Sequence, residues 1–323
     1  MTRLVRRLLI GLAIGVGIPL AVVIYGWYGP GPSEKAQGFI VEEGSSVSGV
    51  AADLQKAGLV ASAARFKAGA RLLGGNDPVQ AGEFEVPAGS SASAILDLLQ
   101  HGRPVQRLIT VTEGMPSIIV REKLAAVPYL SGPVPAIAEG SVLPDSYGYK
   151  RGETRAAVAA RMRAAMTRTL DALWAKRSYA CPIATREQAV TLASIVEKET
   201  GKASERPMIA GVYCNRLRID MKLDADPTVI YPVTKGKPLG RRIRRSELMA
   251  DNGYNTYRRP GLPNGPIANP GKESIAAVLN PASTRAIYFV ADGTGGHVFA
   301  ETFAEHQANV RKWFALRRAR GEM

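Results

Sequence analysis

Cysteine and histidine are scarce in this chain of 323 residues, which contains two cysteines and three histidines. Cys181 and Cys214 are too few for a disulfide scaffold or a cysteine-rich metal site. The histidines, His101, His297 and His306, lie too far apart in the sequence to form a zinc-binding motif. We therefore expect neither a metal ion nor a cofactor.

Acidic residues are also few: 28 Asp and Glu stand against 42 Lys and Arg, a net charge of 42 − 28 = +14. The arginine-rich clusters lack the spaced aromatic residues of a single-strand binder, and no helix-turn-helix or zinc-finger pattern is present. We therefore expect no nucleic-acid partner, but attraction to an anionic surface or polymer. The 46% of hydrophobic residues predicts folded domains rather than wholesale disorder.

Charge is absent from residues 8–28, a run of 21 residues. At about 1.5 Å of rise per residue, this run is long enough to cross a hydrocarbon layer of about 30 Å. Trp27 and Tyr28 would be interfacial aromatics, and the three arginines in residues 1–7 place the amino terminus in the cytoplasm. The sequence predicts a single-pass helix in the cell inner membrane, with the rest of the chain in the extracytoplasmic (periplasmic) space.

A cleaved signal peptide is the competing interpretation of the same run. Signal peptides end in small residues, whereas this run ends in Ile24-Tyr-Gly-Trp-Tyr28 and is followed by Pro30. These features favour an uncleaved anchor. An extracytoplasmic location permits a disulfide between Cys181 and Cys214 but does not require one. Because Cys214 falls in a helical pattern, a free buried thiol is the commoner state, and the sequence leaves the redox state open.

After a Gly/Pro/Ser linker over residues 29–36, the chain matches itself at an offset of 45 residues. The segment Phe39-Ile-Val-Glu-Glu-Gly-Ser-Ser-Val-Ser48 aligns with Phe84-Glu-Val-Pro-Ala-Gly-Ser-Ser-Ala-Ser93. Each copy predicts a short strand, a Gly-Ser turn that caps a helix, and an amphipathic helix. Residues 37–105 should thus form one small α+β subdomain that resembles LysM-type glycan-binding domains. A spacer without a ligand of its own is the alternative.

The composition changes near residue 106, where a larger α+β domain should begin and extend to residue 323. A strand over 108–111 and a long helix over about 154–176 are expected. Thr185 and Gln188 have the spacing of a capping box, so a helix should start there and end at Gly201. Its buried stripe repeats at i, i+3, i+4 and i+7: Ala189, Leu192, Ala193 and Val196.

Two glutamates lie on opposite flanks of that stripe. Glu199 stacks over Ile195 and Leu192, whereas Glu197 has Ser194 beside it. A carboxyl on the more apolar flank is the better candidate for a raised pKa, because desolvation disfavours its charged form. Such an acid could donate a proton at neutral pH. Periodicity alone favours the alternative, in which both glutamates are ordinary exposed charges on either side of Lys198.

Several ordered blocks resemble the endolytic murein transglycosylase family, which is also described as YceG-like. They lie between residues 192 and 297, and with the anchor and the strand-helix repeat they extend the resemblance to nearly the whole chain. The blocks are Leu192-Ala-Ser-Ile-Val-Glu-Lys-Glu-Thr200, Ser204-Glu-Arg206, Asn215-Arg-Leu217, Asp226-Pro-Thr-Val-Ile-Tyr231, Tyr254-Asn-Thr-Tyr257, Gly261-Leu-Pro-Asn-Gly-Pro-Ile-Ala-Asn-Pro-Gly271, Tyr288-Phe-Val-Ala-Asp-Gly293 and Gly296-His297.

The resemblance implies a lyase that cleaves peptidoglycan glycan strands internally, between N-acetylmuramic acid and N-acetylglucosamine, and leaves 1,6-anhydromuramyl ends. It implies no cofactor, peptidoglycan strands as substrate, action near the membrane, peptidoglycan synthases as partners and an influence on strand length. The family's essential glutamate maps to Glu199, which is followed by the hydroxyl residue Thr200; Glu197 is the alternative carboxylate. A non-catalytic wall-binding or scaffold protein is the alternative function.

The resemblance gives weaker roles in substrate binding to residues that could line a glycan groove. Each of them could instead form a turn, cap a helix or pack in the core. These candidates are Asp226, Thr228, Tyr231, Asn255, Tyr257 and Asn269. The chain departs from the family pattern at Asp224, where related sequences often have Gln, and this puts the details of that subsite in doubt.

Overall fold

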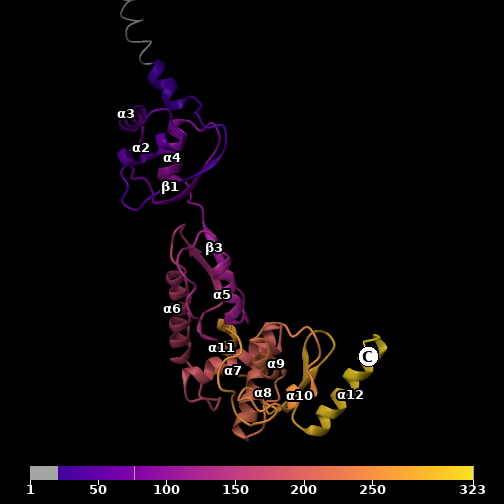
Figure 1. Ribbon diagram of the computed structural model, residues 1–323. Helices are drawn as coiled ribbons and strands as arrows, with labels where there is room; N and C mark the ends of the chain where they lie inside the picture. Colours follow the sequence, from indigo (N-terminus) through magenta and orange to yellow (C-terminus); the bar gives the residue numbers. More distant parts are fainter. Residues whose placement is uncertain (1–20, 76, 323) are drawn as a thin grey trace, which may run out of the picture. The chain divides into compact units, whose positions relative to one another are not determined.

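The computed structural model describes residues 21–75 and 77–322, and the chain divides into two compact units, residues 1–107 and 108–323. Both units contain helices together with short strands that pair in two-stranded sheets, in agreement with the predicted α+β class. Figure 1 shows the helices and strands in chain order. Each unit is described separately below.

The first unit is a two-stranded sheet covered by three helices. Its elements are β1 (Gln37–Val41), α2 (Val47–Lys56), α3 (Ala63–Leu73), β2 (Gly82–Val86) and α4 (Ala92–His101). β1 and β2 are antiparallel, and Phe39 pairs with Phe84 across the sheet. The internal repeat is therefore visible in the fold, because its two copies supply the two strands and the helices α2 and α4. The sequence did not predict α3 between them.

The predicted caps of this unit are present. The Ser46 hydroxyl accepts from the Gly49 backbone N–H at 3.3 Å, and the Ser91 hydroxyl accepts from the Ala94 N–H at 3.1 Å. Each satisfies an amide that the first turn of a helix leaves without a partner. The side chains facing inward form one core that includes Phe66 and Phe84, both almost fully buried.

Residues 21–28 are helical and end against this core. Trp27 is 3% exposed and packs on Phe66, with ring centroids 5.8 Å apart. Its indole lies so close to α3 that a Cβ on Gly69 would be 2.2 Å from the ring. The prediction of Trp27 as an interfacial aromatic is therefore wrong, because the glycine leaves room for the indole in the protein core. Tyr28, in contrast, is 58% exposed.

Most of the membrane span predicted over residues 8–28 lies outside the described residues. Of the helices that the structure does describe, none is both long and apolar enough to cross a bilayer. The predicted linker, residues 29–36, is hydrogen-bonded to the turn before α4: Gly31 N–H donates to Gly89 O at 3.1 Å, and Gly89 N–H to Ser33 O at 2.7 Å.

The second unit begins with a small layer of two strands and two helices. It consists of β3 (Arg107–Val111), α5 (Ser117–Ala126), β4 (Asp145–Tyr149) and α6 (Arg155–Trp174). The strands β3 and β4 pair, and α5 and α6 contribute to the same hydrophobic cluster, which includes Val120 and Met162. The strand predicted over 108–111 and the long helix predicted over 154–176 are confirmed.

The remainder of the second unit is a helical cluster followed by a hairpin. The elements are α7 (Arg186–Glu199), a 3-10 turn (Ala203–Glu205), α8 (Arg206–Arg218), α9 (Asp226–Thr234), α10 (Arg245–Met249), α11 (Lys272–Leu279), β5 (Tyr288–Ala291), β6 (His297–Ala300) and α12 (Phe303–Ala319). α7, α8 and α11 pack on one another and stand together in Figure 1. The antiparallel strands β5 and β6 lie beside α12.

α7 is the central helix of this cluster and carries the residues on which the site depends. The capping box predicted at its start is present, with Thr185 Oγ1 accepting from Gln188 N–H at 3.2 Å. All four residues of the predicted stripe are fully buried. Burial extends further around the helix than predicted: Val190, Thr191, Ser194 and Ile195 are also buried. α7 is thus enclosed by its neighbours on most of its surface.

A disulfide between Cys181 and Cys214 ties the segment before α7 to α8, with Cα atoms 4.9 Å apart. The sequence left the redox state open, and the structure shows the disulfide rather than the commoner free thiol. Helical periodicity places Cys214 in the core but does not show that the turn at Cys181 comes back to within bonding distance of it.

The disulfide closes a loop with a sequence separation of 33 residues, and such a link restricts the unfolded chain. Replacing both cysteines by alanine should lower the free energy of unfolding by about 2–4 kcal/mol. Urea unfolding of the wild type and the double variant, each with and without reductant, measures this effect. Reductant should destabilise only the wild type. A wild type that is insensitive to reductant and as stable as the double variant would contradict the disulfide.

Candidate active site

Glu199 is the last residue of α7, and its carboxyl points into the protein rather than to open solvent. Its Oε1 atom is sealed from solvent and has no hydrogen-bond partner in the part of the chain that the structure describes. An unpartnered buried carboxyl oxygen is costly when the group is charged, because neither water nor a donor stabilises the charge. The environment of Glu199 therefore favours the protonated acid.

Four side chains from other elements surround this carboxyl. Tyr213 and Arg216 come from α8, Asp226 is the first residue of α9, and Tyr257 lies in the loop after α10. Tyr257 Oη donates a hydrogen bond to Asp226 Oδ1 at 2.7 Å. Asp226 is exposed, whereas Tyr213 is almost completely buried. We call Glu199, Tyr213, Arg216, Asp226 and Tyr257 the carboxyl cluster.

Burial raises the pKa of Glu199 to about 7, and the negative charge of Asp226 adds to the shift. Hydrogen bonding with the Tyr213 hydroxyl and the positive charge of Arg216 act in the opposite direction but do not cancel it. The direction agrees with the place of Glu199 on the apolar flank of α7. An acid with a pKa near 7 exists in both protonation states at neutral pH, as a group that donates and then accepts a proton requires.

The two tyrosines remain protonated for a related reason. Burial raises the pKa of Tyr213 well above its ordinary value, and the nearby Glu199 charge raises it further. Burial also raises the pKa of Tyr257, and its hydrogen bond to Asp226 contributes. Both hydroxyls are therefore hydrogen-bond donors over the whole physiological pH range.

Arg216 holds α8 against the segment that leads into α9. Its Nε donates to Ile287 O at 2.6 Å, and its Nη1 donates to Leu223 O at 2.8 Å. The same Nη1 lies 3.7 Å from Asp224 Oδ2. Burial raises the pKa of Asp224, an effect that Arg216 and Lys222 partly offset. Asp224 therefore stands beside the carboxyl cluster, as the second residue before Asp226.

The backbone just after Glu199 is held by a second set of contacts. Thr200 Oγ1 donates to Glu205 Oε2 at 3.1 Å, and His297 Nδ1 lies 2.8 Å from the same oxygen. Burial raises the pKa of Glu205, but the hydrogen bonds from His297 and Thr200 outweigh it, so the pKa is lowered. A Cβ on Gly296 would lie 2.3 Å from Glu205 Oε1, so a larger residue there would displace the Glu205 carboxylate from its present position.

Ring contacts connect the same hairpin to the other side of Glu199. Phe289 makes edge-to-face contacts with His297 and with Tyr213, at centroid distances of 5.2 and 5.7 Å. The hairpin therefore positions both Thr200, which follows Glu199 in the chain, and Tyr213, which lies against its carboxyl. Glu199 is held from two directions.

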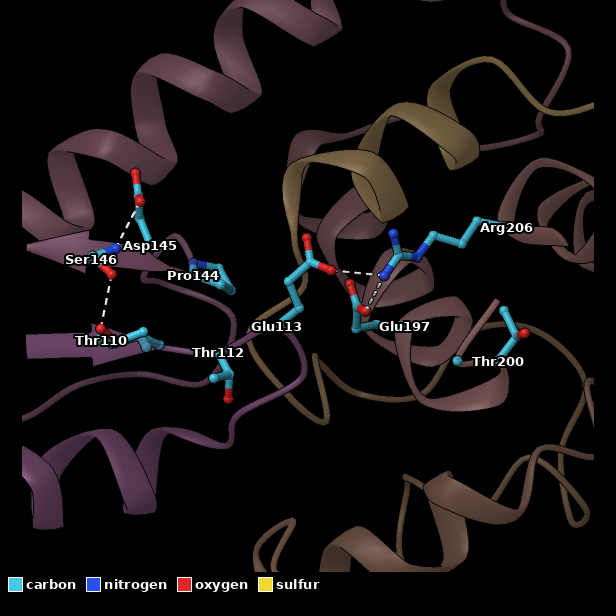
Figure 2. A pocket seen from close by; sticks show the side chains of 11 residues that line it. Thr110, Thr112, Glu113, Pro144, Asp145, Ser146, Glu197, Thr200 and Arg206 are labelled. Atoms are coloured by element: carbon cyan, nitrogen blue, oxygen red, sulfur yellow. Dashed lines mark hydrogen bonds and ion pairs between the residues drawn. The ribbon is translucent and has the colours of Figure 1, made fainter. Parts of the chain in front are cut away.

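Glu197, the alternative carboxylate, has a different environment. Its carboxylate accepts from Arg206 Nη2 at 3.0 Å and from the Gly271 backbone N–H at 2.8 Å. Arg206 also contacts Glu113 at 2.7 Å, and Figure 2 shows both glutamates converging on this guanidinium. Burial alone would lower the pKa of Arg206, but the two carboxylates raise it. Glu197 is thus engaged in holding the end of α7 to the segments at 113 and 271.

A cavity of about 600 Å³ opens beside these three charged residues (Figure 2). Glu199 does not line it, although its neighbour Thr200 does. The lining residues are Thr110, Val111, Thr112, Glu113, Pro144, Asp145, Ser146, Glu197, Thr200, Gly201 and Arg206. The cavity is therefore adjacent to the turn that carries Glu199, but it is distinct from the carboxyl cluster.

Thr228 and Asn255, two of the residues predicted to bind substrate, use their side chains for contacts within the protein. Thr228 is fully buried, and its hydroxyl donates to Ala225 O at 2.7 Å. The Asn255 amide donates to the carbonyls of Leu248 and Ala250 at 2.9 and 2.8 Å. These contacts hold the segment that carries Tyr257 in place.

Asn269 and Tyr231 both lie outside the carboxyl cluster. Asn269 is fully buried, donates to Met115 O at 2.9 Å and accepts from Val142 N–H at 3.2 Å. Tyr231 packs against Tyr254 at a centroid distance of 5.0 Å. Burial raises the pKa of Tyr231, and the charge of Glu139 adds to the effect. Of the six predicted residues, the structure thus brings Asp226 and Tyr257 together with Glu199.

Sequence reasoning missed Tyr213 and Arg216. Both are on α8, and the sequence contained evidence for both. Arg216 lies in the Asn-Arg-Leu block of the family resemblance, and Tyr213, three residues before it, falls on the same helix face. No residues in the described ranges form a group of three or more His, Cys, Asp or Glu side chains that could hold a metal ion. The chemistry available at the cluster is proton transfer by a carboxyl and electrostatic stabilisation by its neighbours.

The raised pKa of Glu199 has a consequence for stability. Its ordinary value is 4.5 and its value in the folded chain is about 7, so between these two pH values the folded chain keeps a proton that the unfolded chain releases. Wild-type stability should fall by roughly 3 kcal/mol as the pH rises from 4.5 to about 7, and should lose no more from this group above that.

Glu199→Gln cannot titrate and should escape this loss. The difference in unfolding free energy between variant and wild type, measured by urea titration at a series of pH values, should widen up to about pH 7 and then level off. Parallel stability curves for the two proteins would show that Glu199 is not a buried acid.

Comparison with known proteins places this chain in a family. The profile of the YceG-like family matches residues 39–312. A protein of Streptococcus pneumoniae named endolytic murein transglycosylase is 28% identical over 319 residues, which cover 84% of this chain and 57% of the relative. One of the same name from Bacillus subtilis is 40% identical over 126 residues, or 39% of this chain and 34% of that protein.

The chain thus spans little more than half the length of the streptococcal relative. The crystal structure of a yceG-like protein from Listeria monocytogenes has the same fold, with a TM-score of 0.54 and 24% identity, over 85% of this chain and 99% of that one. The profile match includes the repeat subdomain, α7 and every residue of the carboxyl cluster. The chain belongs to the YceG-like family.

Proposed function

We propose that this protein is a membrane-anchored endolytic lytic transglycosylase that cleaves peptidoglycan glycan strands at the bond between N-acetylmuramic acid and N-acetylglucosamine. One observation carries the proposal: the Glu199 carboxyl is buried, with one oxygen that has no hydrogen-bond partner among the described residues, and this burial raises its pKa to about 7. The name of the streptococcal and Bacillus relatives, endolytic murein transglycosylase, supports the choice of substrate.

In the first step Glu199 acts as a general acid. Its carboxyl donates a proton to the glycosidic oxygen as the C1–O bond breaks, so that the departing sugar leaves as a neutral alcohol. The muramyl ring then carries positive charge at C1 and its ring oxygen. Asp226, held by Tyr257 at 2.7 Å, supplies a carboxylate beside Glu199 that can stabilise this charge.

In the second step Glu199, now a carboxylate, takes the proton from the C6 hydroxyl of the same muramyl residue. The C6 oxygen forms a bond to C1, which gives the 1,6-anhydro ring and returns Glu199 to its protonated form. Because the nucleophile is part of the substrate, proximity replaces a bound water and no second catalytic carboxylate is required. Arg216 and the Tyr213 hydroxyl stabilise the carboxylate between the two steps.

The first unit fits a role in holding the strand. The order strand, helix, helix, strand, with an antiparallel pair and two serine caps, supports a LysM-like subdomain that binds glycan. The apolar run that begins at residue 8 would anchor the chain in the cell inner membrane, ending before Trp27, which belongs to the core of the first unit, with both units in the extracytoplasmic space. At that location the enzyme would cut nascent strands next to the peptidoglycan synthases and limit their length.

Product analysis tests the proposed reaction. The full chain, incubated with uncrosslinked peptidoglycan, should release fragments that end in 1,6-anhydromuramic acid, identified by mass spectrometry. Glu199→Gln should abolish them, since the amide cannot donate the proton. Glu197→Gln is the matched control on the same helix turn: it should lower stability through its contacts with Arg206 and Gly271, yet retain substantial activity in the folded fraction.

Other outcomes would contradict the proposal in different ways. Reducing ends in place of anhydro ends would indicate hydrolysis with Asp224 or Asp226 as a second carboxylate. Loss of cleavage in Glu197→Gln but not in Glu199→Gln would identify the other glutamate as the acid. Strand binding without cleavage, in the presence of membrane and synthase, would favour a non-catalytic scaffold.

The pH dependence of cleavage tests the role of Tyr213. Because free enzyme needs protonated Glu199, kcat/KM should decline as the pH rises through about 7. Hydrogen bonding with Tyr213 lowers the Glu199 pKa, so Tyr213→Phe should raise that pKa and move the decline to higher pH. Tyr179→Phe, a control at an exposed tyrosine, should leave the profile in place. A decline that moves to lower pH in Tyr213→Phe would contradict this account.

A further inference from the structure

The segment between residues 235 and 259 has a large surplus of positive charge. It contains eight Lys and Arg residues and two acidic residues, a net charge of 8 − 2 = +6 over 25 residues. Three of the basic side chains are neutralised by carboxylates: Lys237 by Glu122, Arg241 by Glu247 and Arg259 by Asp251. We call this stretch the cationic segment.

Four further basic side chains of the cationic segment are fully available to a ligand. Lys235, Arg242, Arg245 and Arg258 are exposed, and no ion pair joins them to a carboxylate within residues 21–75 and 77–322. Unpaired like charges that are close in sequence repel one another and add nothing to the stability of the fold. They do attract anions, and the flat guanidinium fork of arginine matches a carboxylate with two parallel hydrogen bonds.

The cationic segment ends beside the carboxyl cluster. It starts at Lys235, which follows the last turn of α9, the helix whose first residue is Asp226. It returns through Asn255, whose amide holds the last carbonyls of α10, to Tyr257, which donates to Asp226 at 2.7 Å. Arg258 is the next residue in the chain. A strand bound at Asp226 and Glu199 would therefore have Arg258 close to it, and α10, which begins at Arg245, is held to the same loop by Asn255.

We propose that the cationic segment binds the carboxylates of stem peptides, so that the substrate of this site is a glycan strand that still bears its peptides. The inference rests on the proposed function. The sugars of such a strand carry acetamides and hydroxyls but no free charge, whereas the peptides on its muramyl residues end in carboxylates. Exposed arginines beside the cleavage site therefore recognise the peptide part of the polymer, while the carboxyl cluster acts on the sugar part.

A binding measurement separates this proposal from the proposed reaction. Full-length protein with Glu199→Gln is titrated with uncrosslinked strands that bear peptides and with strands from which an amidase has removed them, which leaves one lactyl carboxylate on each muramyl residue in place of the several carboxylates of the peptide. Peptide-bearing strands should bind about tenfold more tightly, as expected for three exposed charge pairs. The preference should decrease as salt is added. Because the readout is binding, it is independent of which bond, if any, the protein cleaves.

Two triple variants with the same loss of charge provide the comparison. Replacing Arg242, Arg245 and Arg258 by glutamine should abolish the preference for peptide-bearing strands. Replacing Arg168, Arg311 and Arg318 by glutamine removes three exposed arginines from α6 and α12 and should leave the preference intact. Equal preferences in the two triple variants, or no preference in the parent protein, would overturn the proposal.

A third arm tests a membrane surface as the partner instead. Vesicles with and without phosphatidylglycerol are mixed with the same variants, and bound protein is measured by sedimentation. If the Arg242, Arg245 and Arg258 variant loses binding to anionic vesicles but keeps its preference for peptide-bearing strands, the partner of the segment is the lipid surface and the proposal is wrong. If it binds vesicles as the parent does, the peptide carboxylates remain the ligand. A lack of anhydro products alone would overturn the reaction and not this preference.

Discussion

The arrangement of the second unit depends on the burial of one carboxyl at the end of α7. Ionising Glu199 in its place costs free energy, because its Oε1 atom is sealed from solvent and receives no hydrogen bond from the residues that the structure describes. That cost is what raises its pKa to about 7. The surrounding groups then adjust the value: Asp226 raises it, while Tyr213 and Arg216 lower it. A carboxyl with this pKa can donate a proton and take it back at neutral pH. The proposed reaction uses no metal ion.

A buried acid is useful only if its position is fixed, and several long-range contacts serve that purpose. The disulfide holds α8 to the segment before α7, and Glu197 binds Arg206 and the backbone at Gly271. On the other side, Thr200, Glu205 and the β5–β6 hairpin hold the residues that follow Glu199. The two neighbouring glutamates of α7 thus have separate tasks. Glu197 holds the end of α7 through Arg206 and Gly271, whereas Glu199 lies in a buried environment that favours its protonated form.

Much of the local structure could be predicted from the sequence. The capping box and the apolar stripe of α7 are local patterns, and so is the repeat that becomes β1, β2, α2 and α4. The raised pKa of Glu199 followed from its flank. Features that depend on distant segments could not be predicted: the indole of Trp27 enters the core because Gly69, far along the chain, has no side chain. Likewise, Asn255 and Asn269 were candidates for sugar binding, but whether an amide satisfies its own protein's carbonyls depends on the folded chain.

Direct titration of Glu199 tests the central claim. Protein labelled with carbon-13 at the glutamate side-chain carboxyls gives one NMR signal per glutamate, and the signal missing from Glu199→Gln identifies residue 199. Its chemical shift, followed from pH 4 to 9, should change with a midpoint near 7, because burial disfavours the carboxylate. A midpoint at the ordinary value of about 4.5 would show that the carboxyl is solvated, and would remove the basis for Glu199 as a general acid.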